Sequence, residues 1–174
     1  VAGVDGVGAL TAVRFGGSEI DGERAFTIGV DPAGLASAYK LTWKEGDDGV
    51  MRDLGPGEAV VDESWAEGRG IDVGDTLDVR TSTDERLRLK VVGSIDEDGL
   101  LADGFIVSNR ELERHWGERR DAFLFLSFAD GADPAATRRA VDRVLERDFP
   151  IVESQDREEV KDAQAGQINQ ALYL

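Results

Sequence analysis

Apolar and polar residues alternate with a period of two along much of the chain, which is typical of half-buried β-strands. The pattern predicts strands over 9–15, 23–30, 59–61, 76–81, 87–91 and 105–107. We expect Gly16 and Gly17 to end the first strand, and the polar, glycine-rich span 45–57 to be a loop between two substructures. The span 122–128 is apolar on both faces, which predicts a strand in the centre of a sheet.

Helices are predicted where a capping residue precedes residues with helical spacing. The predicted caps are Asp31, Asp62, Ser108, Asp133 and Asp156, opening helices that run to about 38, 67, 117, 148 and the end of the chain. A last short strand is expected over 149–152. Together these elements predict an α+β fold in one domain, 1–174. A mixed βα lobe (1–44 with 118–174) would accompany a compact β-rich lobe (45–117).

The final predicted helix carries a narrow apolar stripe and reaches the last residue without a stop signal. The chain begins at Val1 with neither an initiator Met nor a signal-peptide pattern. We therefore expect a fragment of a longer protein, in which the long C-terminal helix leads toward a membrane. An ordinary amphipathic helix docked on the domain is the alternative. No apolar run approaches the roughly 20 residues of a membrane span.

Charge and composition exclude several classes of function. The formal net charge is -16, from 36 acidic and 20 basic residues. Such a chain repels the phosphates that dominate nucleic-acid affinity, so we expect no nucleic-acid partner. It also offers no basic face to anionic lipids. The absence of cysteine excludes disulfides, thiolate nucleophiles and Cys-ligated metals.

Few residues have the character that catalysis or ligand binding requires. His115 is the only histidine, and the sequence contains no nucleophile-elbow pattern G-x-S-x-G that would supply a serine for it. A surface position near a helix C-terminus is therefore the preferred interpretation. Asp96, Asp98 and Asp103 lack the spacing of an EF-hand loop and are read as an acidic turn. Trp65 is expected to pack its helix on the strands, whereas Trp43 is considered for partner binding. The sequence predicts no catalytic, cofactor-binding or metal-binding residue and no cofactor.

One segment resembles a known family. The stretch EAVVDESWAEGRGIDVGDTLDVR (58–80), with GVDP (29–32), KVVGSID (90–96) and the terminal QDREEVK (155–161), is similar to the extracytoplasmic, MacB-like core of FtsX-like and MacB-type ABC transporter permeases. These motifs are structural rather than catalytic. The resemblance is firmest over 29–172.

The resemblance implies a non-enzymatic domain on the extracytoplasmic side of a bacterial plasma membrane, within an integral membrane permease. Its implied partners are a cytoplasmic ABC ATPase acting through the membrane helices, a second permease copy or half, and an unidentified external substrate or partner protein. The domain would couple ATP-driven helix motion to that external component. The alternative is a free-standing extracellular module that binds a solute or peptide; an enzyme using carboxylate chemistry is the third class considered.

Overall fold

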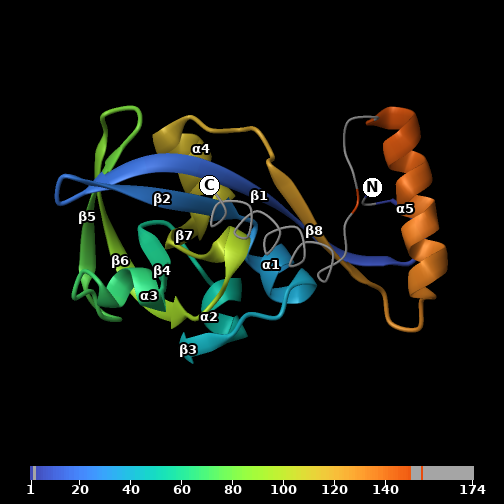
Figure 1. The fold of residues 1–174 in the computed structure, drawn as a ribbon, viewed down its shortest axis with the longest axis horizontal. Coiled ribbons are helices and arrows are strands. Elements are labelled where there is room, and N and C mark those ends of the chain that lie inside the picture. The colour runs from blue at the N-terminus through green and yellow to red at the C-terminus, as the bar shows by residue number, and fades with distance from the viewer. Residues whose placement is uncertain (2, 150–153, 155–174) are drawn as a thin grey trace, which may run out of the picture. The chain divides into compact units, whose positions relative to one another are not determined.

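The computed structural model describes residues 1, 3–149 and 154 (Figure 1). The strands are β1 (Val7–Ile20), β2 (Glu23–Val30), β3 (Trp43–Glu45), β4 (Glu58–Asp62), β5 (Thr76–Thr81), β6 (Arg86–Ile95), β7 (Gly104–Ser108) and β8 (Phe123–Phe128). The helices are α1 (Pro32–Ala38), α2 (Asp48–Arg52), α3 (Glu63–Glu67), α4 (Asn109–Trp116) and α5 (Pro134–Asp148), with a 3₁₀ turn η1 (Gly99–Leu101). The expected α+β class is confirmed.

The chain divides into two compact units, Val1–Val7 with Phe128–Leu174 and Gly8–Ser127. The two boundaries fall inside β1 and β8, so the larger unit holds every other strand and the first four helices. The lobes expected from the sequence, 1–44 with 118–174 and 45–117, stay a prediction.

The smaller unit contains α5. Its Thr137, Val141 and Leu145 are buried and recur every four residues, so they lie on one face of the helix. Gly6 lies against the same helix, and a Cβ at this position would stand 2.1 Å from Thr137 Oγ1. Because Gly6 also has a φ of 89°, both its backbone conformation and this close approach require glycine.

In the larger unit the strands close into a ring. The path runs β2-β7-β4-β6-β5-β1, and β1 pairs again with β2. The end of β1 makes this closure, because residues 18–20 pair with β2 on one side and with β5 on the other. The β2–β7 and β4–β6 pairs are parallel and the other described pairs of the ring are antiparallel. β8 and β3 lie off the ring, next to β1 and β6 respectively.

The strands of the ring bury side chains on both of their faces. Successive residues on a strand point to opposite sides, and the two sets belong to separate cores. One core joins the ring to α3 and α4, through Ala59, Val61, Phe105, Trp65, Leu112 and Trp116. The other joins it to α1 and α2, through Ile28, Val60, Ile106, Leu35 and Met51. Burial on both faces explains why several of these strands read as continuous apolar runs.

The predicted helix starts within the described residues are confirmed by their capping bonds. Asp31 Oδ1 accepts from Gly34 N at 3.1 Å, and Asp62 Oδ2 accepts from Trp65 N at 3.1 Å. Ser108 and Asp133 make equivalent bonds at the starts of α4 and α5. Each cap satisfies a backbone N–H that has no partner inside its own helix.

Two predictions about the first half of the chain are wrong. β1 does not end at Gly16 and Gly17 but continues through both to Ile20, because pairing with β2 supplies hydrogen-bond partners over this stretch. The expected loop 45–57 begins with the last residue of β3 and contains α2, which Asp47 caps through bonds from Gly49 N and Val50 N. A local Asp cap thus overrides the glycine-rich composition there.

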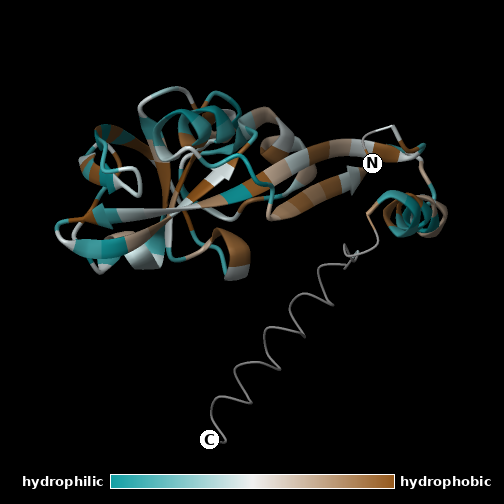
Figure 2. Cartoon of the chain, turned by 90° about the horizontal axis from the view of Figure 1, so that it is seen from above, coloured by the Kyte–Doolittle hydropathy of each residue, from teal (hydrophilic) through white to brown (hydrophobic). Residues whose placement is uncertain are grey.

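The prediction that 122–128 is a central strand is also wrong. β8 lies at the end of the sheet path, next to β1. Phe123 and Leu124 are each 43% exposed, although Figure 2 shows that β8 is largely hydrophobic. β8 is therefore apolar on both faces without lying in the middle of the sheet: Phe125 packs against the second core, whereas Phe123 and Leu124 remain partly exposed.

The expected strand over 149–152 and the final helix after Asp156 lie outside the described residues, apart from Phe149. Phe149 caps the end of α5 through its N–H to Leu145 O. Among the helices in the described part of the chain, none is both long enough and apolar enough to cross a membrane.

Candidate functional site

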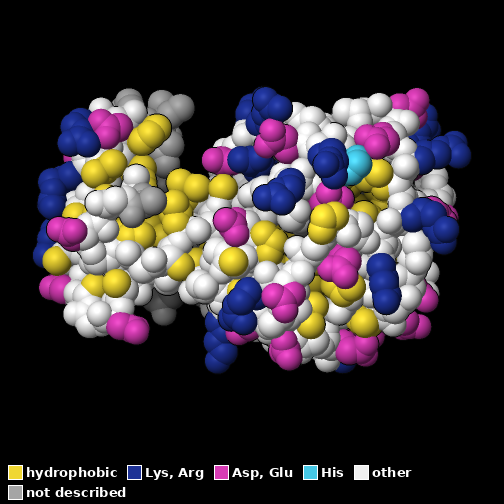
Figure 3. All heavy atoms as spheres, turned by 180° about the vertical axis from the view of Figure 1, so that it is seen from behind, with side chains coloured by type: hydrophobic (Ala, Val, Ile, Leu, Met, Phe, Trp, Pro, Cys, Tyr) yellow, Lys and Arg dark blue, Asp and Glu magenta, His cyan; other side chains and the backbone are white. Residues whose placement is uncertain are grey.

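His115 lies in the last turn of α4 between two carboxylates. Its Nδ1 is 2.9 Å from Glu85 Oε1, and its Nε2 is 3.6 Å from Glu111 Oε2. The side chain is 18% exposed, and Figure 3 shows the histidine among basic and acidic side chains at the surface. Both ring nitrogens therefore face protein groups, which fits a role in joining α4 to the turn between β5 and β6.

The acidic turn does not assemble a metal site. Asp98 precedes η1, and Asp103 adopts a positive φ of 62° just before β7. Within residues 1, 3–149 and 154, no three His, Cys, Asp or Glu side chains converge on a point that a cation could occupy.

The two tryptophans considered from the sequence both pack within the larger unit. Trp65 is 7% exposed and its ring centroid lies 6.0 Å from that of Phe105, which confirms its packing role. Trp43 Nε1 donates to Asp48 Oδ1 at 2.8 Å. Its ring also packs closely against Gly93, where an added Cβ would stand only 2.9 Å from Trp43 Cζ3. Trp43 therefore ties β3 to α2 and to β6, whereas the sequence suggested a position beside a loop.

The larger unit has a shallow groove where β1, β2 and β5 meet. It has a volume of about 710 Å³, and its lining includes Phe15, Gly17, Glu19, Arg24, Phe26 and Arg80. These six residues share one face of the sheet, because cross-strand partners point to the same side. Gly17 pairs with Phe26, and Glu19 pairs with both Arg24 and Arg80.

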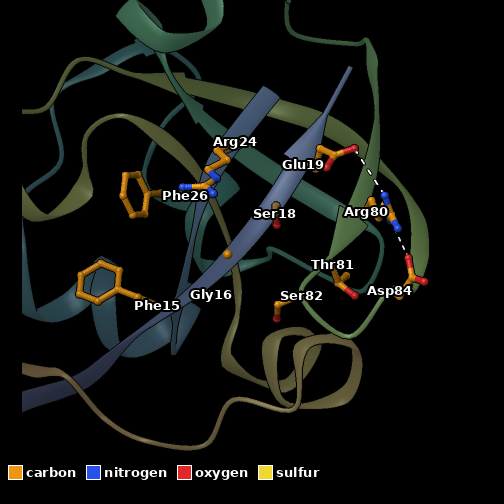
Figure 4. A pocket seen from close by; sticks show the side chains of 12 residues that line it. Phe15, Gly16, Ser18, Glu19, Arg24, Phe26, Arg80, Thr81, Ser82 and Asp84 are labelled. Atoms are coloured by element: carbon orange, nitrogen blue, oxygen red, sulfur yellow. Dashed lines mark hydrogen bonds and ion pairs between the residues drawn. The ribbon is translucent and has the colours of Figure 1, made fainter. Parts of the chain in front are cut away.

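The two ends of the groove differ in character. Figure 4 shows the rings of Phe15 and Phe26 on one side and the Glu19–Arg80–Asp84 chain of ion pairs on the other. Phe15 is half-buried and meets Phe123 edge-to-face, with ring centroids 5.9 Å apart. Phe26 is 63% exposed. The groove therefore joins an apolar end to a charged end.

Phe26 is the most exposed large hydrophobic side chain in the described part of the chain. Its neighbours in register are both glycine: Gly17 on β1 and Gly104 on β7. Neither neighbour has a side chain that could cover the ring. The helices that bury Ile28 and Val30, further along β2 on the same face, do not extend over Phe26.

At the charged end of the groove, Arg80 has carboxylate partners among the described residues and Arg24 does not. Arg80 Nε lies 2.6 Å from Asp84 Oδ1, and Arg80 Nη1 lies 3.7 Å from Glu19 Oε1. The guanidinium lowers the pKa of Asp84 through this hydrogen bond and its charge. Arg24 faces Glu19 in register, yet among the described residues it has no carboxylate within ion-pair distance.

The sequence pattern did not indicate a binding role for any residue of this groove. In the segment ERAFTIGV, Phe26 has the same spacing as the buried Ile28 and Val30, so alternation alone places it in the core. The available signal was Gly17, a glycine inside β1 whose position in the sequence had predicted the end of a strand.

Comparison with known proteins agrees with the fold. Residues 1–144 match the family model of the MacB-like periplasmic core domain. A search of curated proteins found no match.

Two solved structures share this architecture. The periplasmic region of MacB from Actinobacillus actinomycetemcomitans has a TM-score of 0.58 at 11% identity, covering 84% of this chain and 69% of that one. The extracellular domain of the noncanonic ABC-type transporter YknZ from Gram-positive bacteria has a TM-score of 0.59 at 17% identity, covering 87% of this chain and 81% of that one. At such identities the likeness concerns the fold.

Proposed function

Because this chain belongs to the family of MacB-like periplasmic core domains, the extracytoplasmic part of MacB- and FtsX-type ABC transporter permeases, we propose that it couples ATP-driven motion of its parent's membrane helices to an external substrate or partner protein. The cytoplasmic ABC ATPase would act through those helices, and a second permease copy or half would complete the transporter. The family match over residues 1–144 is the observation that carries this proposal.

The ring of strands supports the mechanical part of the proposal. A domain that transmits motion must move as a body, and local opening is most costly where cores are buried and strands are paired. In the larger unit every ring strand pairs on both sides, and two cores cover opposite faces of the strands. Such a body is suited to transmit a displacement rather than absorb it.

The test replaces the domain in its parent. A variant whose residues 1–174 are exchanged for a Gly-Ser linker would be reconstituted with its ATPase in nanodiscs, and in parallel expressed in cells that lack the permease. We expect the nanodisc assembly to hydrolyse ATP, whereas the cells keep the phenotype of the missing permease. A transporter with an ATPase-dead nucleotide-binding subunit gives the matched baseline. Full rescue of the cells by the linker variant would contradict the proposal.

We also propose that the domain itself is not an enzyme. The support is chemical: the chain has no cysteine and one histidine, whose two ring nitrogens face Glu85 and Glu111. The purified chain would be assayed against ATP, peptides and glycans, together with His115→Ala. Turnover that disappears in His115→Ala would show an activity that the proposal denies.

A further inference from the structure

We propose that Phe26 and Arg24 form a docking site for a peptide segment of an extracytoplasmic partner, in which an apolar side chain lies next to a carboxylate. The inference deepens the proposed function and rests on it for the extracytoplasmic location. The binding itself is a property of the 174-residue chain and does not depend on ATP or on membrane helices.

The apolar part of the site is an aromatic ring that is left open on both sides. Gly104 must be glycine, because a Cβ there would stand 2.2 Å from Phe26 O. Gly17 has no such requirement: a Cβ would meet nothing within 4 Å, and its φ is not positive. Glycine inside a strand is destabilising relative to alanine. The effect of glycine at 17 is to leave free space beside the Phe26 ring, where another side chain can pack.

The positive charge of Arg24 favours an acidic residue next to the docked apolar side chain. Arg80 is matched by Glu19 and Asp84, whereas Arg24 has no carboxylate partner among the described residues. Of the two arginines that line the groove, Arg24 and Arg80, Arg24 is the one whose charge is left unmatched by a described carboxylate. Arg24 is two residues before Phe26 on β2, so the two side chains share a face. A carboxylate adjacent to the docked apolar group would complete the pair.

A peptide fits this combination better than a lipid or a solute. Aromatic residues and arginine are the residue types enriched at protein interfaces, and both contribute strongly to binding there. The groove is open and about 710 Å³, which is room for a few side chains rather than an enclosing cavity for a small molecule. Serine and threonine at positions 82 and 81 add hydroxyl groups to its lining.

The test is a titration followed by ¹H–¹⁵N NMR, with a probe that has both features. The labelled chain would receive the peptide Ac-Gly-Phe-Glu-Gly-NH2, and separately its charge-reversed form Ac-Gly-Phe-Lys-Gly-NH2. We expect saturable shifts of the amides of Gly17, Phe26 and Gly104 with the Glu peptide. The Lys peptide should bind about three- to five-fold more weakly, since a single exposed ion pair contributes about this much.

Two variants and a matched control assign the site. Phe26→Ser should abolish the shifts, and Arg24→Glu should reverse the preference between the two peptides. Arg110→Glu makes the same charge change at an exposed position on α4 and should leave both titrations unchanged. All three positions are exposed, so folding of the variants is checked from the dispersion of the same spectra.

Three outcomes would overturn the inference. The first is an absence of localised shifts, and the second is equal binding of the Glu and Lys peptides. The third is that the same amides shift with protein concentration alone, or only with phosphatidylglycerol vesicles, which would assign the groove to a second copy or to a lipid surface. None of these outcomes bears on coupling in the parent transporter, which the linker exchange tests separately.

Discussion

Gly16 of β1 lies directly against Trp116 at the end of α4: a Cβ on Gly16 would stand 2.9 Å from Trp116 Cδ1. The same Cβ would be 3.0 Å from Leu112 Cδ1. Trp116 is 4% exposed, and its Nε1 donates to Ser18 Oγ at 2.9 Å. The close approach of this strand to α4 therefore depends on a residue without a side chain in the middle of β1.

Replacing Gly16 should destabilise the domain, whereas the same change at Gly17 should not. We expect Gly16→Ala to cost about 1–3 kcal/mol, because the added methyl forces Trp116 and Leu112 out of place. Gly17→Ala is the matched control: its Cβ has free space and its backbone is extended, so the free energy of unfolding should be unchanged or higher by up to about 1 kcal/mol. Urea denaturation measures both, and equal effects would contradict the packing argument.

Ser18 should stabilise the fold through its hydroxyl group. It accepts from Trp116 Nε1 and lies 2.5 Å from Thr27 Oγ1, and both Ser18 and Thr27 are buried. Ser18→Ala would leave the buried indole N–H without an acceptor, at a cost of about 1–3 kcal/mol. Ser82→Ala, at an exposed position, is the control and should stay within about 0.5 kcal/mol of the parent chain. Thermal unfolding curves that coincide for the two variants would exclude this role.

Glu111 should tolerate loss of its charge better than loss of its oxygen atoms. The residue is 4% exposed, and its Oε2 accepts from Gly57 N at 3.2 Å. Glu111→Ala removes that acceptor and should cost about 1–3 kcal/mol. Glu111→Gln retains an acceptor and removes a buried charge, so a much smaller change is expected. Chemical denaturation would measure both variants; a larger loss for Gln than for Ala would show that the ionised group itself is required.

Glu118 should titrate at unusually low pH. The Arg120 side chain donates to it from Nε and Nη2, each at 3.2 Å, and the N–H groups of Arg119 and Arg120 also donate. These bonds lower the pKa of Glu118 to about 2, from an ordinary 4.5. Since the folded-state pKa is the lower one, the stabilisation is present above about pH 4.5 and is lost as the pH falls toward 2.

The measurement for Glu118 is an NMR titration of its side-chain carboxyl carbon. In Arg120→Ala the midpoint should move part of the way back toward 4.5, because the backbone donors remain. Arg147→Ala, which breaks a similar exposed pair with Asp148, is the control and should leave the Glu118 midpoint in place. An unchanged midpoint in Arg120→Ala would attribute the low pKa to the backbone donors alone.

Elements whose signals are local in the sequence were predicted well. Asp31, Asp62 and Asp133 each cap a helix at the predicted residue, because a capping bond joins groups two or three positions apart. The strand Thr76–Thr81 was likewise predicted from strict alternation of apolar and polar residues. The family resemblance is confirmed by the match over residues 1–144, which covers the motifs at 29–32, 58–80 and 90–96.

The predictions that were wrong concern features that depend on contacts between distant parts of the chain. The composition of β8 cannot show whether another layer covers it, and its place at the end of the sheet path leaves Phe123 and Leu124 exposed. Gly16 and Gly17 read as a break, yet pairing with β2 carries β1 through them. The groove was missed for the same reason.

The sequence by itself determined the helix caps, most strand positions and the family, because each depends on residues that are neighbours in the chain. Only the tertiary structure decided that Phe26 is exposed while Ile28 and Val30 are buried on the same strand face. That difference arises where the cover of α1 and α2 ends and where Gly17 and Gly104 come beside Phe26. Alternation along a strand specifies which side a residue faces, but the packing of other elements specifies what lies there.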